Sequence, residues 1–136
     1  MNPKYFTFKE LVFSQTALDK KIINIPSWDI IENLKYLGAV LDDLRQAYGK
    51  PITVTSGFRC EELNKAVGGV KNSEHRLGLA ADCRAKDMED FKQFCVDFFK
   101  TYPHDFNQVI LEKSGKTEWV HIGVGGDKRQ IFKIEK

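Results

Sequence analysis

The sequence predicts an α+β protein that has a small, mainly antiparallel sheet with flanking helices. Apolar residues recur at helical spacing mostly in the first part of the chain, and β-branched segments cluster in the last third. This order favours an α+β arrangement over alternating βαβ units. A chain of 136 residues is long enough to bury one hydrophobic core, so we expect a single domain over residues 1–136.

Two helices and a strand are expected in the first part of the chain. Thr7 and Glu10 have the spacing of a capping box, which predicts a short helix that begins there. Apolar residues at helical spacing predict a long helix over 28–48, and Gly49 can end it. The β-branched segment 52–55 predicts a strand that leads into a turn.

The second part of the chain predicts one more helix and most of the sheet. A strand is expected over 80–84, and Asp87 can cap a helix that ends near Tyr102. Cys95 lies in the apolar stripe of that helix, so we expect it in the core. Further strands are expected over 108–111, 119–124 and 130–134.

Composition excludes several classes of function. The net charge of +2 gives no case for a nucleic-acid partner. No apolar run reaches the roughly 20 residues that cross a bilayer, and the start lacks a basic segment followed by an apolar one. We therefore expect synthesis in the cytoplasm without a signal peptide, and no membrane insertion. The three cysteines form no Cys-x-x-Cys pair, which argues against a disulfide framework or a thiolate zinc site.

Polar residues that can do chemistry are concentrated in three short segments between the expected elements, where a rigid scaffold usually presents function. These segments are Ser56–Arg59, Ser73–Asp82 and Glu118–His121.

Two histidines and one aspartate in these segments match the needs of a catalytic zinc site, which takes three protein ligands and leaves a position for water. A turn at Gly78 followed by a strand can bring Asp82 back toward His75, and His121 would come from a neighbouring strand. Taken singly, each residue is more often a surface or core group. Their occurrence together, in order with Arg59 and Glu118, favours the metal site.

These three segments resemble the zinc D-alanyl-D-alanine carboxypeptidases and the phage L-alanyl-D-glutamate endopeptidases, which share a fold with hedgehog signalling domains. The resemblance extends from about Phe6 to Phe132 and is closest to the short, prophage-type members. It implies a hedgehog/DD-peptidase-like fold, a zinc cofactor, and hydrolysis of a peptide bond in the stem peptides of bacterial peptidoglycan. We expect a monomer that acts on the cell wall after release, as a phage endolysin does.

The resemblance also assigns roles to residues. Glu118 corresponds to the catalytic acid or base, Arg59 to a catalytic and substrate-binding arginine, and Ser73 to a substrate-contacting or site-shaping serine. The metal ligands would be His75, Asp82 and His121.

Some positions depart from the family pattern. Asn107 stands where relatives often have Asp, and Gly123 and Val124 follow the last ligand where Ser and an aromatic residue are common. Glu112 is a reserve candidate for the acid or base. The sequence leaves open whether the cleaved bond is a terminal D-Ala-D-Ala or an internal L-Ala-D-Glu bond, and whether the role is lysis, remodelling or recycling. A non-catalytic zinc-binding recognition module of the same fold is the alternative.

Overall fold

The computed structural model describes residues 3–136 and has the predicted α+β architecture. Its helices are α1 (Phe8–Val12), α2 (Gln15–Asp19), α3 (Trp28–Tyr48), α4 (Glu61–Ala66), the 3₁₀ helix η1 (Glu74–Leu77) and α5 (Met88–Lys100). Its strands are β1 (Thr53–Ser56), β2 (Ala80–Arg84), β3 (Gln108–Ser114), β4 (Thr117–Gly123) and β5 (Gln130–Glu135).

The five strands form one sheet in the order β1-β2-β4-β3-β5. All neighbouring strands are antiparallel except β3 and β5, which run parallel. In this register His121 lies opposite Asp82 on one side and Ile110 on the other, and Ser56 lies opposite Asp82. Directly paired residues point to the same face of a sheet, so these four side chains share one face.

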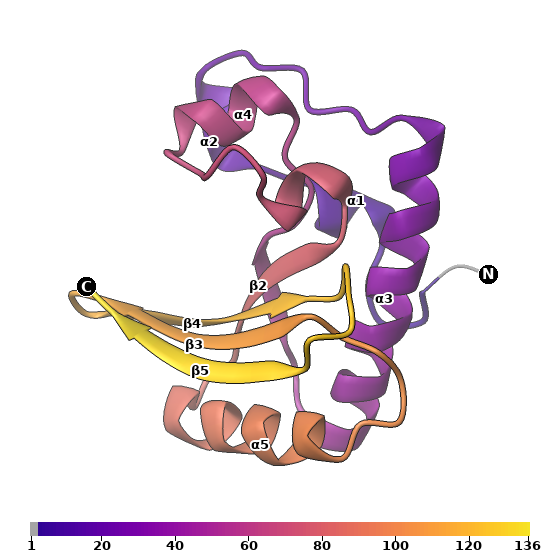
Figure 1. Cartoon of the computed structure of the whole chain (residues 1–136). Helices are drawn as coiled ribbons and strands as arrows, with labels where there is room; N and C mark the ends of the chain where they lie inside the picture. The colour runs from indigo at the N-terminus through magenta and orange to yellow at the C-terminus, as the bar shows by residue number, and fades with distance from the viewer. Residues whose placement is uncertain (1–2) are drawn as a thin grey trace.

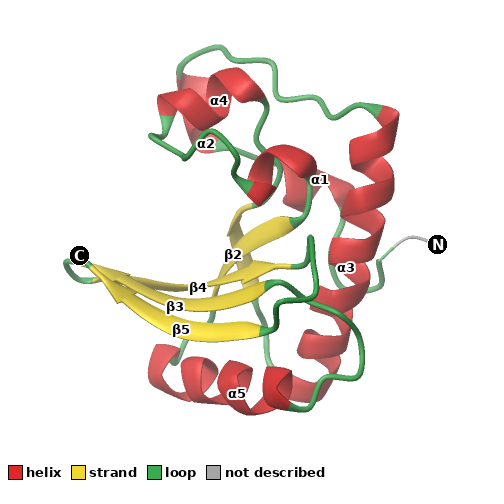
Figure 2. Cartoon of the chain, in the orientation of Figure 1, coloured by secondary structure: helices red, strands yellow, loops and turns green. Residues whose placement is uncertain are grey.

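The helices divide between the two faces of the sheet. Helix α5 lies below the sheet in Figure 1 and α3 runs beside it, whereas α1, α2, α4 and η1 gather above it. We call these four helices the upper lobe. The same layers stand out in Figure 2, where the strands separate the two groups of helices. No helix among residues 3–136 is long and apolar enough to cross a bilayer.

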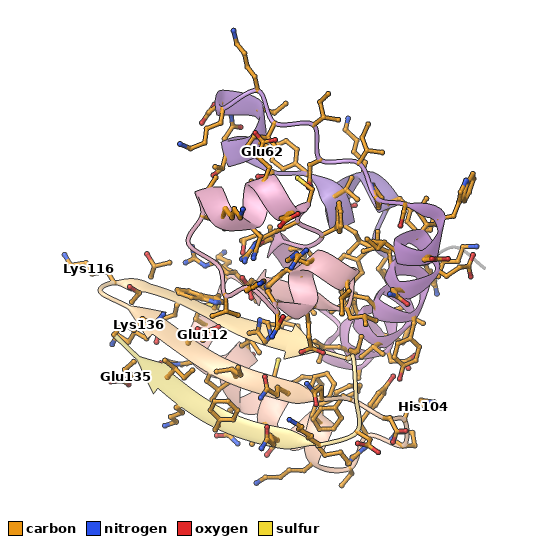
Figure 3. The ribbon with its side chains drawn as sticks, turned by 45° about the horizontal axis from the view of Figure 1, so that its top comes forward. Glu62, His104, Glu112, Lys116, Glu135 and Lys136 are labelled. Atoms are coloured by element: carbon orange, nitrogen blue, oxygen red, sulfur yellow. The ribbon has the colours of Figure 1, made fainter. Side chains whose placement is uncertain are left out.

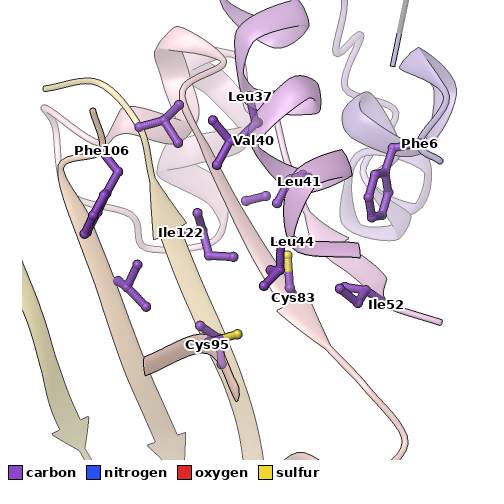
Figure 4. Close-up of a cluster of buried hydrophobic side chains, with 14 of the residues drawn as sticks. Phe6, Leu37, Val40, Leu41, Leu44, Ile52, Cys83, Cys95, Phe106 and Ile122 are labelled. Atoms are coloured by element: carbon purple, nitrogen blue, oxygen red, sulfur yellow. The ribbon is translucent and has the colours of Figure 1, made fainter. Parts of the chain in front are cut away.

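The hydrophobic core fills the space between the sheet, α3 and α5. Figure 4 shows α3 side chains packed toward Cys83 and Ile122 of the sheet, with Cys95 of α5 nearby. Residues in this core with no exposed surface include Leu34, Leu37, Leu41, Leu44, Cys83, Phe91, Cys95, Phe99, Val109, Val120 and Ile122. Burial of this apolar surface stabilises the fold and commits one face of the sheet to packing. The opposite face is free to carry polar side chains.

Most elements occur where the sequence predicts them. The long helix and the strand at 80–84 have the predicted bounds, and the capping box of Thr7 and Glu10 is present. The strands β3 and β4 are longer than expected at their hairpin ends. The short helices α2, α4 and η1 were not predicted, because helices of 4–6 residues are too short to show a periodic pattern.

The turn after β1 is fixed against α1. The backbone N–H of Phe58 donates to the carbonyl oxygen of Leu11 at 2.7 Å. A side chain at Gly57 would overlap that same carbonyl oxygen, which is backbone and cannot swing away. Glycine is therefore required where the turn crosses α1, and this contact holds the segment Ser56–Arg59 in place.

We expect Gly57→Ala to destabilise the protein by about 3 kcal/mol, because the added methyl group must displace the α1 backbone. Gly115→Ala is the matched control, since Gly115 has a φ of +61° but no atom within 4 Å of the added carbon. It should cost about 1 kcal/mol from backbone strain alone. Urea unfolding measures both free energies, and equal losses would contradict the proposed contact.

Candidate metal centre

Three predicted ligands converge at the boundary between the sheet and the upper lobe. His75 comes from η1, Asp82 from β2 and His121 from β4. The Nδ1 atom of His121 lies 3.0 Å from Oδ1 of Asp82, and Nε2 of His75 lies 3.4 Å from the same oxygen. One ligand atom from each residue lies within 4.8 Å of the others. Ligands about 2.1 Å from a tetrahedral zinc ion are about 3.4 Å apart, so this donor set fits zinc.

The imidazole of His75 is held in one tautomer. Its Nδ1 atom lies 2.8 Å from the carbonyl oxygen of Gly57, and the ring is buried. A carbonyl oxygen can only accept, so Nδ1 carries the proton and donates it. Nε2 is then the nitrogen on the side of Asp82, and in its unprotonated form it can bind a metal. Ser73 supports this arrangement, because its hydroxyl accepts the backbone N–H of His75 at 3.2 Å and caps η1.

Charge favours a cation at this point. Burial alone would raise the pKa of Asp82, but its hydrogen bonds to His121 and His75 and the charges of these rings hold that pKa well below its usual range. Burial would lower the pKa of His121, but the hydrogen bond and charge of Asp82 raise it. Asp82 is thus an ionised carboxylate, the state that ligates a metal ion.

Arg59 lies beside the three candidate ligands. Its Nη2 atom is 3.6 Å from Oδ2 of Asp82, its Nε donates to the Ser56 hydroxyl at 3.1 Å, and its backbone N–H donates to the His75 carbonyl at 3.0 Å. Burial lowers the pKa of Arg59, although the charges of Asp82 and Glu112 oppose this. An arginine remains cationic in proteins, so the site keeps a positive charge next to the ligands.

Asn64 is a residue of the site that sequence reasoning missed. It is 2% exposed, accepts from Nη1 of Arg59 at 3.3 Å, and donates to the carbonyl oxygen of Val70 at 2.8 Å. A side chain at Gly69 would overlap the Asn64 amide. Asn64 therefore orients the guanidinium and closes the loop before the metal motif. No spacing in the sequence distinguishes it from a surface asparagine of a helix.

Glu118 is not brought to the metal ligands. It pairs with Lys113 of β3 and lies three residues before His121 within the continuous strand β4. Side chains alternate between faces along a strand, so positions 118 and 121 point to opposite faces. The Oε1 atom of Glu118 accepts from Nζ of Lys92 on α5 at 2.8 Å, and this hydrogen bond lowers the pKa of Glu118.

Glu112 lies on the face that carries the ligands. It is opposite Trp119 in the β3–β4 pairing, two residues along from the Ile110–His121 pair. The indole Nε1 of Trp119 donates to Oε2 of Glu112 at 3.1 Å. After burial and Asp82, the charge of Glu112 is a further influence on the pKa of His121, which it raises. The reserve candidate is thus the acidic side chain of the hairpin that faces the site, and Trp119 lies beside it.

Fold and site together define an α+β domain with a candidate metal site of two histidines and one carboxylate, a donor set typical of mononuclear zinc hydrolases. The chain belongs to the peptidase M15 family, whose sequence profile matches residues 4–123. It is also 37% identical over 91 residues to the zinc D-Ala-D-Ala carboxypeptidase of Streptomyces albus G. That alignment covers 65% of this chain and 34% of the relative, so the chain spans about a third of the relative's length. The predicted family is confirmed, and the donor set agrees with zinc as the cofactor.

We expect the purified protein to bind one zinc ion and His121→Ala to lose it, because two ligands remain where three are needed. His104→Ala is the control, since His104 is an exposed histidine that is not among the candidate ligands. Zinc content after dialysis, measured by atomic emission, checks both variants. Retention of one zinc ion by His121→Ala would contradict the assignment of this ligand.

Proposed function

We propose that this chain is a zinc-dependent peptidase that hydrolyses a peptide bond in the stem peptides of bacterial peptidoglycan. The observation that carries the proposal is the convergence of His75, Asp82 and His121 beside the guanidinium of Arg59. The family match covers this whole set of residues. The name of the Streptomyces relative, which includes D-Ala-D-Ala and zinc, supports the substrate class.

Zinc, when bound, supplies a water molecule of lowered pKa and a positive charge that polarises a carbonyl group. Arg59 is held in position by Ser56, Asn64 and Asp82, and its positive charge can bind an anionic group of the substrate. A guanidinium binds a carboxylate through two parallel hydrogen bonds, and stem peptides carry free carboxylates. We assign Arg59 to substrate binding and to charge stabilisation at the scissile carbonyl. Ser73 contributes by fixing the backbone of His75, whose N–H donates to the Ser73 hydroxyl.

The acid or base of the reaction is assigned to Glu112 in place of Glu118. A general base must come within about 3 Å of the proton it takes, directly or through one water, and must therefore lie on the face of the ligands. The pairing of β3 with β4 places Glu112 on the face of the ligands. Glu118 is on the other face, in an ion pair with Lys92. Glu112 would accept the proton of the attacking water and transfer it to the leaving amine. Its presence argues against the non-catalytic recognition module.

The cleaved bond is either the terminal D-Ala-D-Ala bond or the internal L-Ala-D-Glu bond. The Streptomyces relative is named for the first, and the phage endopeptidases that this chain also resembles cut the second. An endopeptidase would suit phage lysis, because cutting the stem close to the glycan releases cross-links. A carboxypeptidase would suit wall remodelling or recycling, because it trims the stem without releasing it.

We expect the zinc-loaded protein to change the masses of purified peptidoglycan fragments, and a chelator-treated sample to leave them unchanged. Loss of a terminal D-alanine from pentapeptide stems would identify the carboxypeptidase. Release of stem peptides that begin with D-Glu would identify the endopeptidase. Unchanged masses with stoichiometric zinc bound would overturn the proposal and favour the recognition module.

We expect Glu112→Gln to lower kcat by a factor of about 10² or more with zinc still bound, because an amide cannot accept the proton. Glu118→Gln, an identical change on the opposite face of the hairpin, should keep kcat within about threefold. Steady-state kinetics on the fragments, with zinc content determined for each variant, compares the two. A large loss in Glu118→Gln and none in Glu112→Gln would restore the original assignment.

A further inference from the structure

The residue before the first ligand connects η1 to the end of β4. Glu74 accepts the backbone N–H of Gly125 on Oε1 at 2.7 Å. Its own carbonyl oxygen accepts from Leu79 at 3.0 Å, and the carbonyl oxygen of Leu79 in turn accepts from Val124 at 2.8 Å. The segment after His121 is therefore fastened to the segment that carries His75, and the Glu74 carboxylate is part of this connection.

Two glycines make room for this carboxylate. A side chain at Gly123 would overlap Oε2 of Glu74, and one at Gly125 would lie 2.5 Å from Oε1. The carbon added at Gly123 would also be 3.3 Å from Nε2 of His121. The Glu74 carboxylate and the Nε2 edge of His121 thus flank the same small space, on the side of the ring away from its Nδ1 contact with Asp82.

A metal-bound histidine has one nitrogen on the metal and needs a fixed partner for the other. That partner is usually a carboxylate, a carbonyl group or a water, and it sets the orientation of the ring. Nδ1 of His121 faces Asp82 and the other ligand, so Nε2 is the nitrogen that needs the partner. Glu74 supplies a carboxylate on that side, held in place by Gly125.

We propose that Glu74 is a positioning residue for the metal ligand His121, and that its carboxylate fixes the imidazole ring from the Nε2 side, across one water molecule or by direct contact. This inference rests on the zinc centre of the proposed function. It also explains why Gly123 departs from the family pattern: the serine common at that position has no room beside Glu74.

Zinc affinity tests the inference without relying on hydrolysis. We expect Glu74→Ala to raise the zinc Kd by 10- to 100-fold, the usual effect of removing such a partner. Glu74→Gln keeps an oxygen acceptor but loses the charge, and it should fall between Glu74→Ala and the wild type. Glu62→Ala is the matched control, since it removes an exposed carboxylate of α4 in the upper lobe, well away from Glu112 and the sheet (Figure 3), and should not change Kd. A Kd for Glu74→Ala within twofold of the wild type would overturn the inference.

A double-mutant cycle on the zinc-free protein tests the same contact through stability in place of metal affinity, and Glu74→Gln replaces Glu74→Ala in it if the alanine variant folds poorly. We expect Gly123→Ser to destabilise the wild type and to cost less in the Glu74→Ala background, because the carboxylate that it meets is gone. Additive free energies of unfolding would contradict the shared space. Intact zinc binding without wall hydrolysis counts against the proposed function alone, whereas an unchanged Kd in Glu74→Ala counts against this inference alone. A wild type that binds no zinc would refute both.

Discussion

The register between β2 and β4 is the constraint on which the site depends, because it places Asp82 opposite His121. A slip of one residue would turn one of the two side chains to the opposite face. The same slip would expose Cys83 or Val120, which have no exposed surface and pack against α3 and α5. The hydrophobic core on one face therefore fixes the geometry of the metal ligands on the other.

The upper lobe completes the site through backbone contacts. η1 brings His75 over the sheet, and the Gly57 carbonyl selects its tautomer. The turn that contains Gly57 is in turn held by the Leu11 carbonyl of α1. The buried Phe58 anchors this turn in the core, and hydrogen bonds hold the loops of the site in position. Arg59 shows the same design, because its guanidinium is held by Asn64, Ser56 and Asp82.

The sequence predicts those features that have a period or a known spacing. The helix over 28–48 and the capping box at Thr7 are local patterns, and the structure has both. The side of Glu118 could not be inferred, because the predicted strand began at residue 119 and left position 118 outside it. β4 begins at Thr117, so alternation along the strand applies to Glu118 as well. Asn64 acts through hydrogen bonds to Arg59 and Val70, which no spacing in the sequence predicts.

The two faces of β4 separate chemistry from packing. Trp119, His121 and Gly123 lie on the face of the site, whereas Glu118 lies with the buried Val120 and Ile122 on the face toward α5. The ion pair of Glu118 with Lys92 then joins α5 to the edge of the core. Glu118, three positions before the ligand His121, can thus have a structural role. Glu112, on the neighbouring strand β3, is the acidic residue that we propose for the chemical role. Strand geometry favours Glu112 over Glu118 as the acid or base more directly than spacing along the chain does, because of these two residues Glu112 is the one on the face of the ligands.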